Sequence, residues 1–141
     1  MESGEQEIDR VRDVMGSVYK AFEGLDANNL DANFSHSEDL LAFGTDWDEK
    51  FVGWNSYKDV HTVQFEALRS FKFARRELEV QVNGETAWAS DRPHWEIETK
   101  SGERVENDVR ITAVLRKERD MTWRIVQWHV SVGLKERLHE Y

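Results

Sequence analysis

The sequence predicts a single α+β domain in which helices come first and cover one face of an antiparallel sheet. Early in the chain the apolar residues recur every three or four positions, which is the helical period. After residue 72 they recur at every second position, in segments separated by turn residues, which is the period of strands. A chain of 141 residues with 39% hydrophobic side chains is the right size for one layered core of this kind.

The first helix is predicted from Ile8 to Leu25, because one apolar stripe runs along this segment. The members of the stripe are Ile8, Val11, Val14, Met15, Val18, Tyr19, Phe22 and Leu25. Residues 26–29 break the pattern and are expected to end the helix.

Shorter elements are expected between the first helix and residue 72. They are a short helix at 30–34, a buried strand at 39–44, a loop at 45–53 and a helix that ends at Phe71. Asn55 or Ser56 is the expected N-cap of that last helix, since both side chains can accept a hydrogen bond from a free backbone N–H.

The rest of the chain is predicted to form strands at 78–82, 86–99, 105–117 and 123–132. Asn83 and Gly84 are expected to form the first hairpin turn because both tolerate a positive φ. Pro93 lies within the second strand, where it cannot donate a ladder hydrogen bond, so a bend, bulge or exposed edge is expected there.

One domain is expected to span residues 8–132. Residues 1–7 precede the first apolar position and are expected to be a flexible N-terminus. Residues 133–141 are expected to form a charged C-terminal tail that frays. No repeat or low-complexity linker divides the sequence between them.

Composition excludes several classes of function. A formal net charge of −9 would repel a phosphate backbone, so nucleic acid is not an expected partner. The absence of cysteine excludes disulfides, thiol nucleophiles and cysteine-ligated zinc. The first ten residues do not have the pattern of a signal peptide, and no apolar run approaches the ~18 residues of a membrane span. We therefore expect a cytoplasmic protein with no membrane contact and no cofactor.

Several sequence strings resemble the SnoaL-like branch of the nuclear transport factor 2-like superfamily, which has a cystatin-like α+β fold. They are LLAFGTDWDEKFVGW, TAWAS, the step from Arg110 to Thr112, and WRIVQWHVSVG. The last string also resembles the association domain of calmodulin-dependent kinase II. The resemblance extends from Ile8 to Val132. It implies a cone-shaped half-barrel, a pocket between helix and concave sheet, and a homodimer formed through the outer sheet face.

The strand that begins at Thr86 supplies most of the polar candidates for this pocket. Trp88, Arg92 and His94 share one face if no bulge intervenes, and the resemblance to the kinase domain implies that this face lines the pocket. Arg110 is expected beside them on the next strand. Two guanidiniums would favour an anionic ligand, since arginine makes bidentate charged hydrogen bonds. The alternative is that these arginines pair with nearby acids, and that His94 packs instead of titrating as an acid or base.

The last strand has one apolar and one semi-polar face. Its apolar set includes Trp128, which is expected to face the core or pocket. The set Gln127, His129 and Ser131, together with Trp123 and Ile125, is expected on the other face. We interpret His129 as part of a dimer face, although it could also be catalytic.

Aromatic side chains from the first half of the chain are expected to cover the cavity. The candidates are Tyr19, Phe43 and Trp54, with the Tyr19 hydroxyl as the expected hydrogen-bond donor. By the resemblance, Phe43 takes the place of the catalytic base of ketosteroid isomerase, which argues against that chemistry. Carboxylates with a histidine suit several divalent ions, but the spacing of Asp46, Asp48, Glu49 and His61 fits no recognised site, so no metal is predicted.

The function predicted from the sequence is a small-molecule-binding homodimer with an aromatic pocket for an apolar, anionic ligand. Two alternatives stay open. One is an isomerase, cyclase or dehydratase that uses acid–base chemistry in the same pocket, for which no base with an orienting partner can be named. The other is an oligomerisation module whose cavity has no role.

Overall fold

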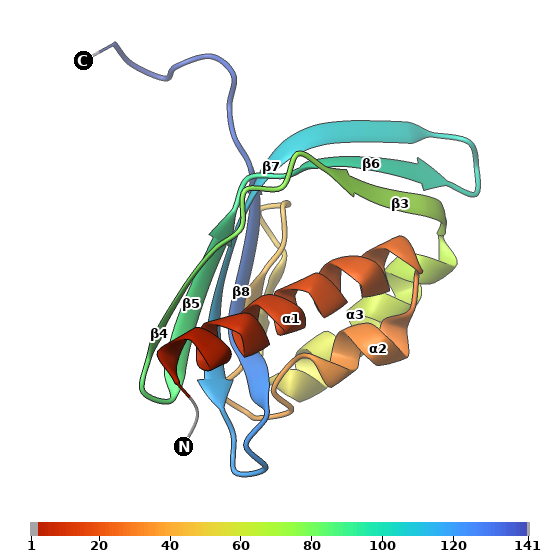
Figure 1. Cartoon of the computed structure of the whole chain (residues 1–141). Helices are drawn as coiled ribbons and strands as arrows, with labels where there is room; N and C mark the ends of the chain where they lie inside the picture. The colour runs from red at the N-terminus through yellow and green to blue at the C-terminus, as the bar shows by residue number, and fades with distance from the viewer. Residues whose placement is uncertain (1–2, 141) are drawn as a thin grey trace.

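The helices lie on the concave side of a strongly curved, unclosed sheet, as the computed structural model shows for residues 3–140 (Figure 1). The helices are α1 (Gly4–Glu23), α2 (Ala27–Ala32) and α3 (Trp54–Glu66). The strands are β1 (Leu41–Phe43), β2 (Lys50–Val52), β3 (Leu68–Ala74), β4 (Glu79–Asn83), β5 (Thr86–Asp91), β6 (His94–Thr99), β7 (Arg104–Lys117) and β8 (Trp123–Val132). The predicted α+β class is confirmed.

Helix α1 begins at Gly4, earlier than the apolar stripe that predicted it. Ser3 and Gln6 form a capping box, in which each side chain accepts a hydrogen bond from the backbone N–H of the other. This arrangement satisfies two donors that a helix start otherwise leaves free. The segment expected to be flexible, 1–7, therefore overlaps the cap and first turn of α1, while residues 1–2 lie outside the described residues.

Helix α3 has a different start and end from those predicted. Its N-cap is Gly53, at a φ of 82°, and a Cβ there would lie 3.2 Å from the backbone oxygen of Glu38. The Ser56 hydroxyl caps nothing, because it donates to carbonyls of the preceding turn. The helix ends at Glu66, so the predicted extension to Phe71 is wrong: β3 starts at Leu68. In the described part of the chain, no helix has the length and apolarity needed to cross a bilayer.

The sheet has eight strands in residues 3–140, and its path runs β2-β1-β8-β7-β5-β4, with β6 and β3 continuing from β7. The predicted antiparallel pairing holds except between β1 and β8, which run parallel. Strands β2 and β3 were not predicted. The loop expected at 45–53 contains β2, which pairs with β1.

The bend predicted at Pro93 is confirmed and shapes the sheet. The expected strand 86–99 is split there into β5 and β6. The two halves pair with different parts of the long strand β7, with residues 111–116 and 104–108 respectively. As Figure 1 shows, β3, β6 and the first half of β7 consequently arch over the helices. A hollow between helices and sheet follows from this curvature.

A bulge in β8 changes which residues face the core. Val114 of β7 pairs with Gln127, but the next residue, Leu115, pairs with Ile125, so Val126 is an extra residue. An extra residue reverses the alternation of side chains on either side of it. Trp123 and Ile125 are therefore buried on the same face as Trp128 and Val130, and their predicted place on the outer face is wrong.

Asp91 at the end of β5 joins three parts of the fold. Its side chain is 3% exposed and accepts the Tyr19 hydroxyl of α1 at 2.7 Å. Its other oxygen accepts the backbone N–H groups of Glu77 and Arg92, at 2.6 and 2.7 Å. A buried carboxylate is tolerated when hydrogen bonds replace its water. The Asp91 carboxylate thus holds together α1, the segment before β4 and the β5–β6 bend.

Replacing Tyr19 with Phe should lower the free energy of unfolding by about 1–3 kcal/mol, because it leaves a buried carboxylate oxygen without its donor. Urea unfolding followed by circular dichroism would measure the loss. The matched control is Tyr57→Phe, since the Tyr57 hydroxyl makes no hydrogen bond within residues 3–140 and its removal should change stability much less. Equal losses in the two variants would contradict the role given to Tyr19.

Candidate functional site

An apolar cavity of about 330 Å³ lies between the helices and the concave sheet face. It is bounded by α1 and α3 on one side and by β3, β6 and β8 on the other. A volume of this size lies within the range of small-molecule sites in proteins. Most of the lining is aromatic or aliphatic, and includes Phe22, Phe71, Trp95, Ile97, Trp128 and Val130.

Tyr57 of α3 is one of the polar residues of the cavity lining, together with Thr45, Glu49 and Gln64. Burial raises the pKa of its hydroxyl well above the usual range, and the charges of Asp31 and Glu49 raise that pKa further. The hydroxyl is therefore protonated at neutral pH. Since it makes no hydrogen bond to the residues that the structure describes, it is available to donate one to an acceptor in the cavity.

Glu49 and Trp95 add one negative charge and one free donor to the lining. The Glu49 carboxylate accepts the backbone N–H of Asp46 at 2.9 Å, which holds it at the cavity wall. The indole N–H of Trp95 is buried and has no partner in residues 3–140. Because an unpaired buried donor is unfavourable, an acceptor that reached it would stabilise the site.

Asp31 and the buried His61 form a partly buried pair next to Tyr57 of the cavity wall. Nδ1 of His61 lies 2.5 Å from the Asp31 carboxylate, and the side chain is 1% exposed. Its Nε2 has no partner among the described residues. Burial lowers the pKa of His61, although its hydrogen bond to the Asp31 carboxylate opposes this shift. The imidazole is therefore neutral at pH 7, with Nδ1 donating to Asp31 and Nε2 free to accept a proton.

The His61 ring contacts Tyr57 at a centroid distance of 4.5 Å. A base with an orienting carboxylate and a hydroxyl donor therefore lie side by side. This is the combination that proton abstraction next to a carbonyl requires: the imidazole takes the proton and the hydroxyl stabilises the developing oxyanion.

Of the aromatic residues predicted for the pocket, Trp128 lines the cavity and faces inward. Phe43 also borders the cavity, but it is the register partner of His129, and its ring lies 5.2 Å from the His129 ring on the side of the sheet that His129 occupies. Tyr19 does not line the cavity, since it is buried elsewhere and donates its hydroxyl hydrogen bond to Asp91. Trp54 stacks on the His36 ring at a centroid distance of 4.1 Å.

The predicted placement of Trp88, Arg92, His94 and Arg110 on the concave face is wrong. These residues do share one face, as predicted, but it is the outer one: Trp88 is 42% exposed and the Arg92 side chain 71% exposed. Ala87, Ala89 and Asp91 take the inner positions of β5 instead, and Asp91 accepts the Tyr19 hydroxyl of α1 there.

The two arginines therefore do not provide an anion site in the cavity. Arg92 pairs with Glu77 at 3.0 Å. This agrees with the alternative that the arginines pair with nearby acids. Arg110 lies near it, on the rim of a separate surface hollow. The acids of the 46–49 loop do not gather around His61 either, since the partner of His61 is Asp31.

Sequence reasoning missed the Asp31–His61 pair and Tyr57. One signal was available: His61 follows Tyr57 and precedes Phe65 by four residues each, so a histidine occupies the apolar stripe of a helix. A titratable residue at such a position must find a buried partner. The partner itself comes from α2, thirty residues earlier, and no local pattern identifies it.

Comparisons with known proteins agree with this architecture. A family model described as SnoaL-like domain matches residues 11–135. The comparison with curated proteins found no match.

Three similar solved structures share the fold. A Streptomyces avermitilis protein of the nuclear transport factor 2-like family, provisionally named a dehydratase, has a TM-score of 0.83 at 18% identity, covering 94% of this chain and 99% of its own. A superfamily member from Salmonella enterica has a TM-score of 0.82 at 16% identity, covering 99% of both chains. A Caulobacter vibrioides protein with a cystatin-like fold has a TM-score of 0.74 at 15% identity, covering 90% and 89%.

Proposed function

The chain belongs to the SnoaL-like domain family, and on that premise we propose that it binds a small, largely apolar molecule in the cavity beside α3. The observation that carries the proposal is the Tyr57 hydroxyl, which has no partner among residues 3–140, in a largely apolar lining. Apolar walls supply most of the binding free energy of such a site, and a single polar group orients the ligand. The ligand is therefore expected to carry one hydrogen-bond acceptor, such as a carbonyl oxygen.

The charge of the site argues for a neutral ligand. Glu49 is in the lining, and its negative charge would repel an anion in a medium of low dielectric constant. The arginines that suggested an anionic ligand lie on the outer face. The proposed ligand is therefore uncharged, in contrast to the anionic ligand expected from the sequence.

A second candidate function is that of an acid–base lyase or isomerase, which the Asp31–His61 pair favours. In this scheme Nε2 of His61 removes a proton from the carbon next to the ligand carbonyl. The electron pair moves to the carbonyl oxygen, and the Tyr57 hydroxyl donates to the resulting enolate. The name of the Streptomyces protein supports this class of reaction. A shift of the Tyr57 ring would have to open Nε2 to the cavity.

The outer sheet face is proposed to form a homodimer, as expected from the sequence. It carries Trp88, which is 42% exposed, and the polar residues Gln127, His129 and Ser131 of β8. Large aromatic side chains with polar neighbours are typical of subunit interfaces. The place of His129 on this face, against Phe43, supports its interpretation as an interface residue and not a catalytic one.

The cavity should bind acetophenone more tightly than ethylbenzene and much more tightly than benzoate, three probes of similar size. Tyr57→Phe should weaken binding of acetophenone about three- to tenfold, the effect of one hydrogen bond, and leave ethylbenzene unchanged. Isothermal titration calorimetry would measure the affinities. Val60→Trp, which fills the cavity, should abolish binding of both. Binding that survives Val60→Trp would show that the ligand site is elsewhere.

The protein should exchange the methyl hydrogens of acetophenone for deuterium in D₂O, and His61→Gln should slow this exchange about 100-fold or more. Proton NMR would follow the loss of the methyl signal. His36→Gln, which removes an exposed histidine, is the matched control and should exchange normally. If His61→Gln exchanges as fast as the control, the acid–base function is wrong, whereas binding of the ketone would still stand.

Trp88→Glu should convert a dimer into a monomer, because it places a charge in an apolar contact. Trp47→Glu makes the same change at a tryptophan that is fully exposed outside this face and should leave the dimer intact. Sedimentation equilibrium would distinguish the two results. A wild-type protein that sediments as a monomer would refute the interface.

A further inference from the structure

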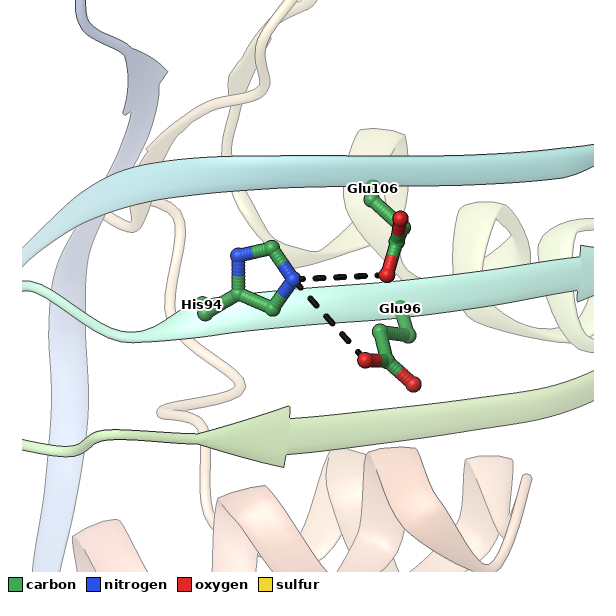
Figure 2. Close-up of side chains that lie close together, drawn as sticks. All are labelled: His94, Glu96 and Glu106. Carbon is green, nitrogen blue, oxygen red and sulfur yellow. Dashed lines mark ion pairs between the residues drawn. The ribbon is translucent and has the colours of Figure 1, made fainter.

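Three potential metal-ligand side chains gather on the outer face of the sheet, where β6 pairs with β7. Figure 2 shows His94 and Glu96 on β6 and Glu106 on β7, with all three side chains pointing toward one another. One ligand atom from each lies within 4.8 Å of the others. The sheet fixes this arrangement, because Glu96 and Glu106 are partners in the β6–β7 register and His94 lies two residues before Glu96.

The His94 ring is held in the orientation that a metal ligand needs. Its Nδ1 lies 2.9 Å from the Asp108 carboxylate, its cross-strand partner. This bond gives Nδ1 the proton and leaves the lone pair of Nε2 toward the two glutamates. A carboxylate behind the imidazole is the usual companion of metal-binding histidines.

The two glutamates lack a partner that would neutralise them. Like charges directly opposite each other on neighbouring strands are destabilising. The ion pairs recorded for Glu96 and Glu106 in residues 3–140 are with Nε2 of His94, at 3.9 and 3.6 Å, which is longer than a hydrogen bond. Lys72 of β3 is the register partner of Glu96, but it forms no ion pair with it in the described residues.

We propose that His94, Glu96 and Glu106 bind a divalent transition-metal ion, with Zn²⁺ the best-suited ion. Zinc bonds of about 2.0–2.2 Å in tetrahedral geometry put neighbouring ligand atoms about 3.4 Å apart. The observed separations are slightly longer, and rotation of the two exposed glutamate side chains can close them. Because imidazole is a poor ligand for Mg²⁺ and Ca²⁺, the set favours zinc over these ions.

This metal site is independent of the proposed ligand cavity. The inner residues of β6, Trp95 and Ile97, line the cavity, while His94 and Glu96 point to the opposite side of the same strand. Failure of one proposal therefore leaves the other intact. Val60→Trp, which should abolish ketone binding, should bind zinc like the wild-type protein.

Titration of the full chain with ZnCl₂ in a calorimeter tests the site. Glu106→Gln should weaken zinc binding about tenfold or more, and His94→Ala should remove the site. Glu103→Gln makes the same charge change on the same hairpin outside the cluster, and should bind zinc like the wild-type protein. Thermal unfolding without metal would check that each variant is folded.

A ¹⁵N NMR spectrum of the histidine side chains gives an atom-specific readout. Zinc should shift the Nε2 resonance of His94 and leave its Nδ1 protonated. The proposal is overturned if His94→Ala and Glu106→Gln bind zinc as tightly as the wild-type protein, since other histidines would then be the ligands. It is equally overturned if the wild-type protein binds no zinc, or if the shifted resonance belongs to another histidine.

Discussion

The architecture depends on the buried carboxylate of Asp91. It lies where β5 ends and the chain bends at Pro93, and it accepts hydrogen bonds from α1, from the segment before β4 and from the bend itself. Each of these donors would otherwise need water that the core excludes. The angle between the two halves of the sheet is therefore tied to the position of α1. Since the hollow under the arch is the space between these elements, its shape depends on the same carboxylate.

Much of the fold could be predicted from local patterns. Periodicity predicts the apolar stripe of α1. The backbone chemistry of Asn83-Gly84 and of Pro93 predicts the hairpin and the break in the strand. Strand β3 could not be separated from α3, because the apolar positions of the two run together without a breaker. The β8 bulge could not be predicted either, since only the pairing with β7 identifies Val126 as the extra residue.

The site was predicted less well because it depends on which face each strand turns inward. The residues of β5 were grouped correctly, but Trp88 was expected inside because of the resemblance to the kinase association domain, whereas Ala87 and Ala89 are the buried residues of the strand. That one reversal moved the polar candidates from the cavity to the outer surface. The sheet separates an apolar cavity, with the partly buried His61–Asp31 pair beside it, from an outer face rich in charge. The two sides of the sheet therefore offer different chemistry.

The parallel pairing of β1 with β8 has a consequence for how the chain matures. Residues 41–43 find their partners only at 127–129, and Phe34 bridges to Ile125. Contacts between such distant segments form late, because a long loop has to close first. During synthesis on a ribosome, the contacts of α1 with β8 would form only after the last strand had emerged, whereas its contacts with β3 and β4 could form earlier.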